Sequence, residues 1–122
     1  MNKIKVVIKR PNEQMQIIEV KDLKEINKLL GNFNEKGEAD SSTGSDYRQG
    51  IFKGIDMHVN GKSLFNADLP KNFWDVNGNR LYCGNVIFAG YDSNITKDYG
   101  VCSLTDEKID YLMNNIKQLF EI

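Results

Sequence analysis

The segment that most constrains the fold is NVIFAGY at 85–91, the most apolar run in the chain. A short apolar run that lies between turn-forming residues is typical of a buried strand. Gly84 precedes this run, and the polar segment 92–98 follows it. We therefore expect residues 85–91 to form a central strand of a sheet.

Other segments have the pattern of strands that pair around this one. Residues 3–9 alternate basic and apolar side chains, which predicts a half-buried strand, and Met15 to Val20 would form a hairpin with it. Further strands are expected at 51–59, at 62–65 after the Asn60-Gly61 hairpin turn, and at 99–102. The intervening segment 66–80 is expected to be irregular.

Two segments have the signals of helices. Asp22 and Glu25 form a capping-box pattern before an apolar stripe that ends at Gly31. The second helix would begin after Thr105, a favourable N-cap residue. Its apolar side chains recur at helical spacing and would bury a continuous stripe: Ile109, Leu112, Met113, Ile116, Leu119 and Phe120.

These elements predict one α+β domain over residues 1–122, a chain length typical of a single domain. We expect a mainly antiparallel sheet of five to six strands with two helices on one face, the C-terminal helix packed on the sheet. The polar segment 32–50 is rich in Gly, Ser, Asn and Asp, and we expect a flexible loop there.

Charge and cysteine content restrict the classes of partner. The net charge is −1, and the basic residues Lys3, Lys5, Lys9 and Arg10 lie on an alternating strand whose exposed face they would keep solvated. We therefore expect neither a nucleic-acid nor a membrane partner.

The two cysteines, Cys83 and Cys102, fit no metal or redox spacing. The sequence also has no signal-peptide pattern, so we expect reduced thiols in the core of a soluble, cytoplasmic protein.

No motif for catalysis or for a cofactor stands out. His58 is the only histidine, and alternation places it on the same strand face as Asp56, which predicts a solvated surface pair. The segment 92–103 resembles the start of a calcium loop, but it has Lys97 where a glycine is needed and Ser103 where a glutamate is needed. We expect no bound metal and no cofactor.

An interaction surface is the remaining candidate. The segment LPKNFW places Lys71, Asn72, Phe73 and Trp74 between strands, and exposed aromatic residues are frequent anchors for partners. The alternative is that Phe73 and Trp74 only fill the end of the sheet.

The order of motifs resembles an uncharacterised family of small proteins encoded by phages and mobile elements of Gram-positive bacteria. The resemblance covers residues 3–31 and 55–113, and segment 32–50 departs from it. Its motifs are KVVIKRPNE, LLG, VNGK, LPKNFW, CGNVIFAG and YGVCSLTDEKID. The resemblance implies an accessory protein that binds, blocks or sequesters a host component, such as an anti-CRISPR protein.

The leading hypothesis is therefore a non-enzymatic binding protein whose partner is a host or phage protein. The first alternative is a module that binds a small ligand or nucleotide, with Tyr47, Arg48 and Trp74 lining a pocket. The second alternative is a small enzyme that uses His58.

Overall fold

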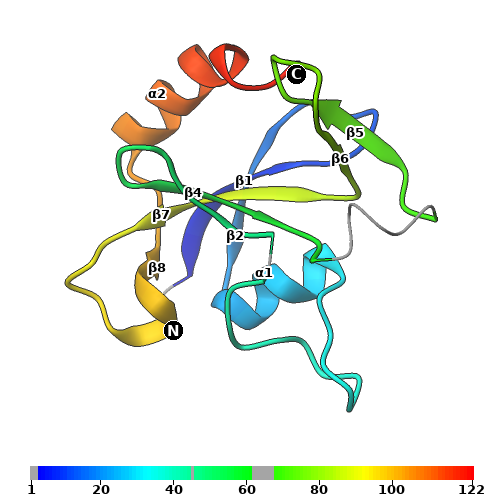
Figure 1. Cartoon of the computed structure of the whole chain (residues 1–122). Coiled ribbons are helices and arrows are strands. Elements are labelled where there is room, and N and C mark those ends of the chain that lie inside the picture. Colours follow the sequence, from blue (N-terminus) through cyan, green and yellow to red (C-terminus); the bar gives the residue numbers. More distant parts are fainter. Residues whose placement is uncertain (1–2, 45, 62–67) are drawn as a thin grey trace.

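The computed structural model describes residues 3–44, 46–61 and 68–122, and within them it confirms an α+β fold (Figure 1). The main sheet is antiparallel in every pairing, with the order β2-β1-β7-β4-β3 and with β8 paired to the end of β7. Its strands are β1 (Ile4–Lys9), β2 (Gln16–Val20), β3 (Arg48–Phe52), β4 (Ile55–Val59), β7 (Val86–Tyr91) and β8 (Val101–Cys102).

Strand β7 is central, as its apolar sequence predicts. It pairs with β1 on one side and with β4 on the other, and only Tyr91 among its residues is not fully buried. The predicted strand at 99–102 is shorter than expected, because residues Lys97–Gly100 form a 3-10 helix before β8. The predicted strand at 62–65 lies outside the described residues.

Both helices begin where the sequence indicates, and α1 also ends there, whereas α2 ends at Asn115, before the last residues of its predicted apolar stripe. The Asp22 side chain accepts a hydrogen bond from the Glu25 N–H at the start of α1 (Leu23–Leu30), and Gly31 ends this helix with a φ of 80°. Thr105 caps α2 (Asp106–Asn115) by accepting from the Lys108 N–H at 3.2 Å. A short 3-10 helix, Ile116–Gln118, continues α2. No helix in the described ranges is long and apolar enough to cross a membrane.

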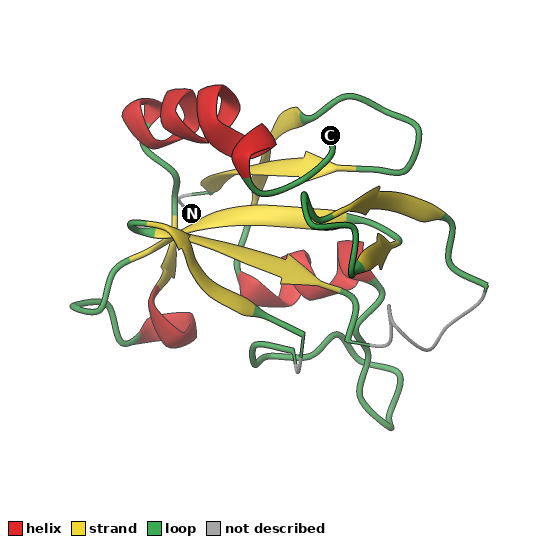
Figure 2. Ribbon diagram, turned by 45° about the horizontal axis from the view of Figure 1, so that its top comes forward, coloured by secondary structure: helices red, strands yellow, loops and turns green. Residues whose placement is uncertain are grey.

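The helices cover opposite faces of the sheet, and the prediction that both lie on one face is wrong (Figure 1, Figure 2). Helix α1 packs on the face that carries Val6 and Ile87, whereas α2 packs on the face that carries Val7 and Phe88. Strand β1 is therefore buried on both sides at its centre and is not half-buried. Val6 and Val7 point to opposite faces of the sheet, so each face has an apolar side chain that a helix must cover.

The polar segment between α1 and β3 is held by side-chain amides. The Asn27 side chain donates to the carbonyl oxygens of Asp40 and Ser42, both at 2.9 Å. The Asn32 side chain donates to the Val59 carbonyl oxygen at 3.0 Å, which ties the segment to the end of β4. The flexibility expected for residues 32–50 stays a prediction.

A second, two-stranded sheet forms where the sequence predicts irregular chain. Strands β5 (Lys71–Trp74) and β6 (Leu81–Cys83) are antiparallel, and their register is irregular between Lys71 and Phe73. This hairpin lies beside the C-terminal end of the chain in Figure 1, and the Glu121 N–H donates to the Trp74 carbonyl oxygen. The irregular register weakens the alternating pattern by which a strand is recognised in sequence.

Candidate functional site

The β5–β6 hairpin has one face in the core. Phe73 pairs with Tyr82 across the hairpin, and both side chains are buried. Their ring centroids are 5.4 Å apart, and the Phe120 ring, which follows α2, lies 5.2 Å from Phe73. These aromatic contacts attach the hairpin to the face of the sheet that α2 covers.

The opposite face of the hairpin carries apolar side chains toward solvent. Trp74 pairs with Leu81 across the hairpin, so their side chains lie on one side, and Val76 is in the turn that follows β5. Trp74 is 42% exposed and Val76 is 46% exposed, while Leu81 is partly buried. We call Trp74, Val76 and Leu81 the hairpin surface.

Asn72 fixes this hairpin to the main sheet. Its side-chain nitrogen donates to the carbonyl oxygens of Lys9 and Gly84, each at 2.8 Å. Its side-chain oxygen accepts from Lys9 Nζ at 2.9 Å. The hairpin surface is therefore held by three hydrogen bonds from one side chain.

The four predicted binding residues of this segment have different roles. Phe73 fills the core and Asn72 forms internal hydrogen bonds, whereas Lys71 and Trp74 are exposed. Both interpretations drawn from the sequence thus apply in part, with Phe73 filling the end of the sheet and Trp74 open to contact.

Tyr47 and Arg48 contact different parts of the structure. The Tyr47 hydroxyl donates to the Asp56 carboxylate, and its ring lies 4.9 Å from that of His58. Arg48 donates to the Tyr82 hydroxyl at 2.7 Å, with its guanidinium 5.5 Å from the centre of the Phe120 ring. Two hollows on the described surface, one beside α2 and one at the end of α1, have none of Tyr47, Arg48 and Trp74 in their linings.

His58 and Asp56 are buried, and the prediction that they form a solvated pair is wrong. Asp56 is 0% exposed and His58 is 2% exposed, because both face the side of the sheet that α1 covers and Tyr47 packs over His58. Burial lowers the pKa of His58 to about 4, and its Nε2 has no hydrogen-bond partner among the residues that the structure describes. Asp56 accepts instead from the Gly50 N–H at 2.7 Å and from the Tyr47 hydroxyl.

The same contacts change the acidity of Tyr47. Burial, and next the hydrogen bond to Asp56, raise the pKa of the Tyr47 hydroxyl, so it remains a hydrogen-bond donor. Through Asp56, which accepts from Tyr47 and from the Gly50 N–H, these contacts link β4 to β3 and to the residue that precedes it.

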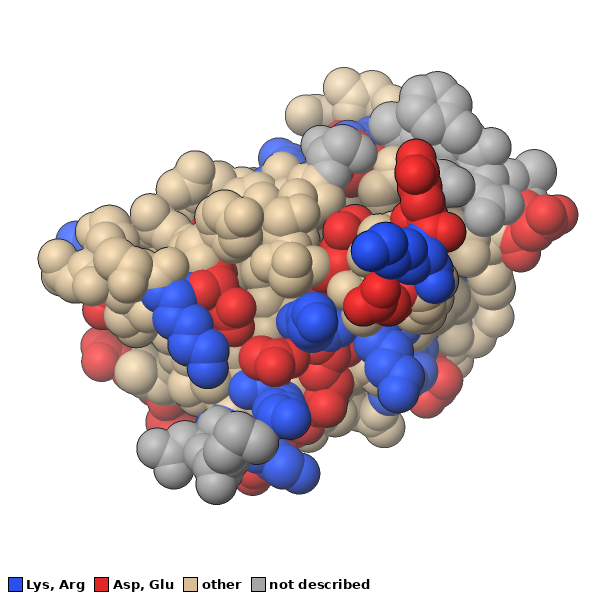
Figure 3. All heavy atoms as spheres, turned by 90° about the horizontal axis from the view of Figure 1, so that it is seen from below, with Lys and Arg blue, Asp and Glu red and all other residues tan. Residues whose placement is uncertain are grey.

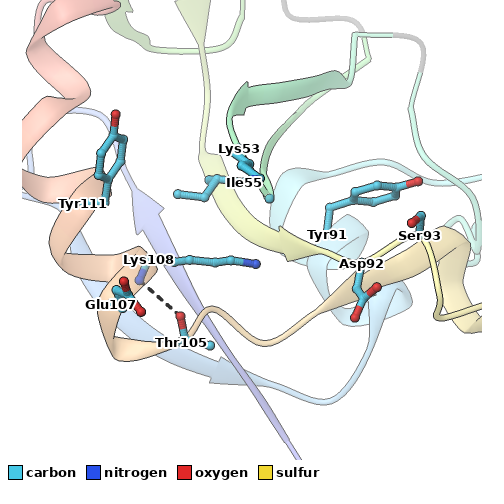
Figure 4. Close-up of a pocket in the computed structure, with 10 residues that line it drawn as sticks. Lys53, Ile55, Tyr91, Asp92, Ser93, Thr105, Glu107, Lys108 and Tyr111 are labelled. Carbon is cyan, nitrogen blue, oxygen red and sulfur yellow. Dashed lines mark hydrogen bonds between the residues drawn. The ribbon is translucent and has the colours of Figure 1, made fainter.

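An open cleft of about 800 Å³ lies between the β3–β4 turn, the end of β7 and the start of α2 (Figure 4). Lys53 comes from the turn, Tyr91 from β7, and Lys108 and Tyr111 from α2. No sequence signal indicates this cleft, because its residues come from three separate segments and share no motif.

Other features of the surface favour no single class of ligand. On the face seen in Figure 3, which carries α1, basic and acidic side chains are mixed and neither forms a continuous field. In the described ranges, no group of three or more His, Cys, Asp or Glu residues could hold a metal ion. Cys83 and Cys102 are free thiols, both partly buried.

No protein-family model, no curated protein and no solved structure matches the chain.

Proposed function

We propose that the chain is a non-enzymatic binding protein that contacts a protein partner through the hairpin surface. The observation that carries this proposal is the placement of Trp74 on the outer face of a hairpin whose inner face is locked into the core. Exposed tryptophans surrounded by apolar neighbours are the side chains that most often dominate the free energy of protein association.

The attachment of the hairpin supports the same role. Asn72 holds β5 to the main sheet, and the backbone of residues 119–121 holds its end through hydrogen bonds to Trp74 and Val76. A partner that contacts Trp74 would not have to order the strand that carries it. Preorganisation of this kind preserves binding free energy that a mobile loop would lose.

The two alternative functions have less geometric support. The ligand hypothesis requires Tyr47, Arg48 and Trp74 to line one pocket, yet Tyr47 contacts His58 and Arg48 contacts Tyr82. The enzyme hypothesis requires a substrate to reach His58, whose side chain is covered on the α1 side of the sheet. A general acid or base must come within hydrogen-bond distance of the group that it serves.

The sequence resemblance to phage and mobile-element proteins adds a proposal for the partner class. In that context the partner would be a component of the host cell, and a defence protein such as a CRISPR effector is the example to test first. This part of the proposal depends on the resemblance and not on the hairpin geometry.

Affinity purification from host-cell lysate, with mass spectrometry of the retained proteins, tests the proposal. A partner retained by the wild type should be lost with Trp74→Ala and kept with Tyr99→Ala, a matched control in which an aromatic side chain that is 61% exposed lies elsewhere. Loss of about tenfold or more in affinity is expected at a dominant contact residue. Equal retention by both variants would contradict a role for the hairpin surface.

A spectroscopic measurement complements the purification. Trp74 is the only tryptophan in the chain, so its fluorescence reports on this surface alone. Binding of the retained partner in a tryptophan-free form should shift the emission to shorter wavelength, because the indole leaves water. An unchanged spectrum in a saturated complex would place the interface elsewhere.

A further inference from the structure

The open cleft beside α2 is a second candidate site, and it does not depend on the hairpin surface. Figure 4 shows Lys108 extending from α2 across the cleft, with its ammonium nitrogen pointing toward the side where Tyr91 and Asp92 lie. The partly buried Lys108 side chain reaches the β3–β4 turn, where Gly54 leaves room for it.

Gly54 is needed for this arrangement for two reasons. Its φ of 73° lies in the left-handed region that favours glycine. A Cβ atom at this position would lie only 2.6 Å from Lys108 Nζ and 2.9 Å from its Cε. The turn therefore provides both the conformation and the space that bring the Lys108 ammonium to Gly54, the residue that follows Lys53.

The two lysines of the cleft lack acidic partners. Within the residues that the structure describes, neither Lys53 nor Lys108 forms an ion pair. Asp92 also lines the cleft, but one of its carboxylate oxygens accepts from the Asn94 N–H at 2.9 Å, in the turn that follows β7. Glu107 is exposed at the first turn of α2, where a carboxylate interacts favourably with the helix end.

We propose that this cleft binds an acidic segment of a polypeptide, with one side-chain carboxylate held between Lys53 and Lys108. Carboxylates form charge-assisted hydrogen bonds with ammonium groups. Tyr91 and Tyr111 flank the lysines and offer apolar ring surface to the rest of the segment.

The shape and charge of the cleft favour a polypeptide over other anions. Small-molecule sites usually enclose most of their ligand, whereas this cleft is open to solvent. A nucleic acid would bring a phosphate at every nucleotide, and the exposed carboxylates of Asp92 and Glu107 would repel it. An acidic peptide can place one carboxylate at the lysines and its uncharged backbone beside the acidic groups.

A capped hexapeptide with one glutamate among uncharged residues, titrated into the full ¹⁵N-labelled chain and followed by NMR, tests the proposal. Chemical-shift changes should centre on residues 53–55, 91–93 and 105–111. Hexalysine and a six-nucleotide thymidine DNA, at the same concentration and ionic strength, should cause smaller changes there. Equal or larger changes with the DNA, or changes spread evenly over all lysines, would overturn the proposal.

Variants locate the contact. Lys108→Gln should weaken binding of the one-glutamate peptide by up to about fivefold, the upper end expected when one exposed charged contact is lost. Lys117→Gln, an exposed lysine outside the cleft, should leave binding unchanged. Gly54→Ala should weaken binding because it displaces the Lys108 ammonium. If binding to Lys108→Gln equalled that of the wild type, with both spectra showing a folded chain, the proposal would be wrong.

Discussion

The two faces of the main sheet are closed in different ways. On the α2 face the contacts are almost all between apolar and aromatic side chains from β7, β4, the hairpin and α2. The α1 face carries four of the five buried polar or charged residues among the described positions, which are Asn27, Asp56, His58 and Asn60; the fifth is Lys9.

The comparison shows how the covering element sets the chemistry of a buried face. A helix satisfies most of its own backbone hydrogen bonds, so the strands beneath α2 can be apolar. The α1 face is closed in part by the irregular segment before β3, whose backbone groups need partners. Asn27 and Asn60 supply such partners by donating to carbonyl oxygens of Asp40, Ser42 and Leu30.

Removal of the apolar cover should have the largest effect. Deletion of residues 105–122 takes away α2 and Phe120, and it exposes the side chains of Met57 and Phe88. We expect the truncated chain to lose its cooperative unfolding transition, which calorimetry would detect. A truncated chain that melts near the full-length midpoint would show that the sheet stays folded without α2 on its apolar face.

A single change within the same cover should be large but tolerable. Leu112 is 0% exposed, and Leu112→Ala should lower the free energy of unfolding by about 2–5 kcal/mol through lost burial and a residual cavity. Urea unfolding measures this value. Asn114→Ala, at an exposed position of the same helix, is the control and should change it by less than about 0.5 kcal/mol.

The α1 face, which carries most of the buried polar residues and is called the polar face below, should make the free energy of unfolding depend on pH. His58 has a pKa of about 4 in the folded chain against 6.5 in its ordinary state, so the unfolded chain binds a proton first as the pH falls. Its contribution is complete above pH 6.5 and is lost as the pH falls toward 4. We expect a loss of about 2 kcal/mol between pH 7 and pH 5, and a shallower dependence in His58→Gln.

NMR gives a direct check of this pH dependence. The chain has one histidine, so one imidazole signal can be followed through the titration. Its midpoint should lie below pH 5 in the folded protein. A midpoint near 6.5 would mean that water reaches the ring and that the polar face is open.

The smallest effect is expected at the anchor of the polar segment. Asn27→Ala removes the two hydrogen bonds to the carbonyl oxygens of Asp40 and Ser42 and the one that Asn27 accepts from the Asn32 side chain. These three partner residues are only partly buried and can bond to water instead. We expect a cost of about 1 kcal/mol. Hydrogen exchange should accelerate in residues 32–44 and stay unchanged in β7, since the contacts of β7 are elsewhere.

Much of the fold could be predicted from local sequence patterns. The caps at Asp22 and Thr105 and the apolar strand at 86–91 depend on neighbouring residues alone, and the structure confirms them. The positions of the helices on opposite faces depend on which side of each strand is covered. Alternation in the sequence indicates that two faces exist, but it does not indicate what lies against each face.

The candidate sites were less accessible to sequence reasoning for the same physical cause. Trp74 stands out by residue type, but its partner Leu81 is recognised only once β5 and β6 are paired. In the sequence Lys108 is an ordinary helix lysine, and only the structure shows that its side chain reaches Gly54 in the β3–β4 turn. His58 seemed solvated because the residues that cover it, Tyr47 among them, lie in a segment without a strand or helix pattern.

The central position of β7 also determines when the sheet can assemble during synthesis. Val7 of β1 pairs with Phe88, and Met57 of β4 pairs with the same residue, so the earlier strands lack their common neighbour until β7 has left the ribosome. Among the described strand pairings, those of the β1–β2, β3–β4 and β5–β6 hairpins can form before that point. Pairings between distant segments slow folding. Because α2 must also cover the sheet, a nascent chain should become resistant to proteases only after both residues 86–91 and residues 105–122 have emerged.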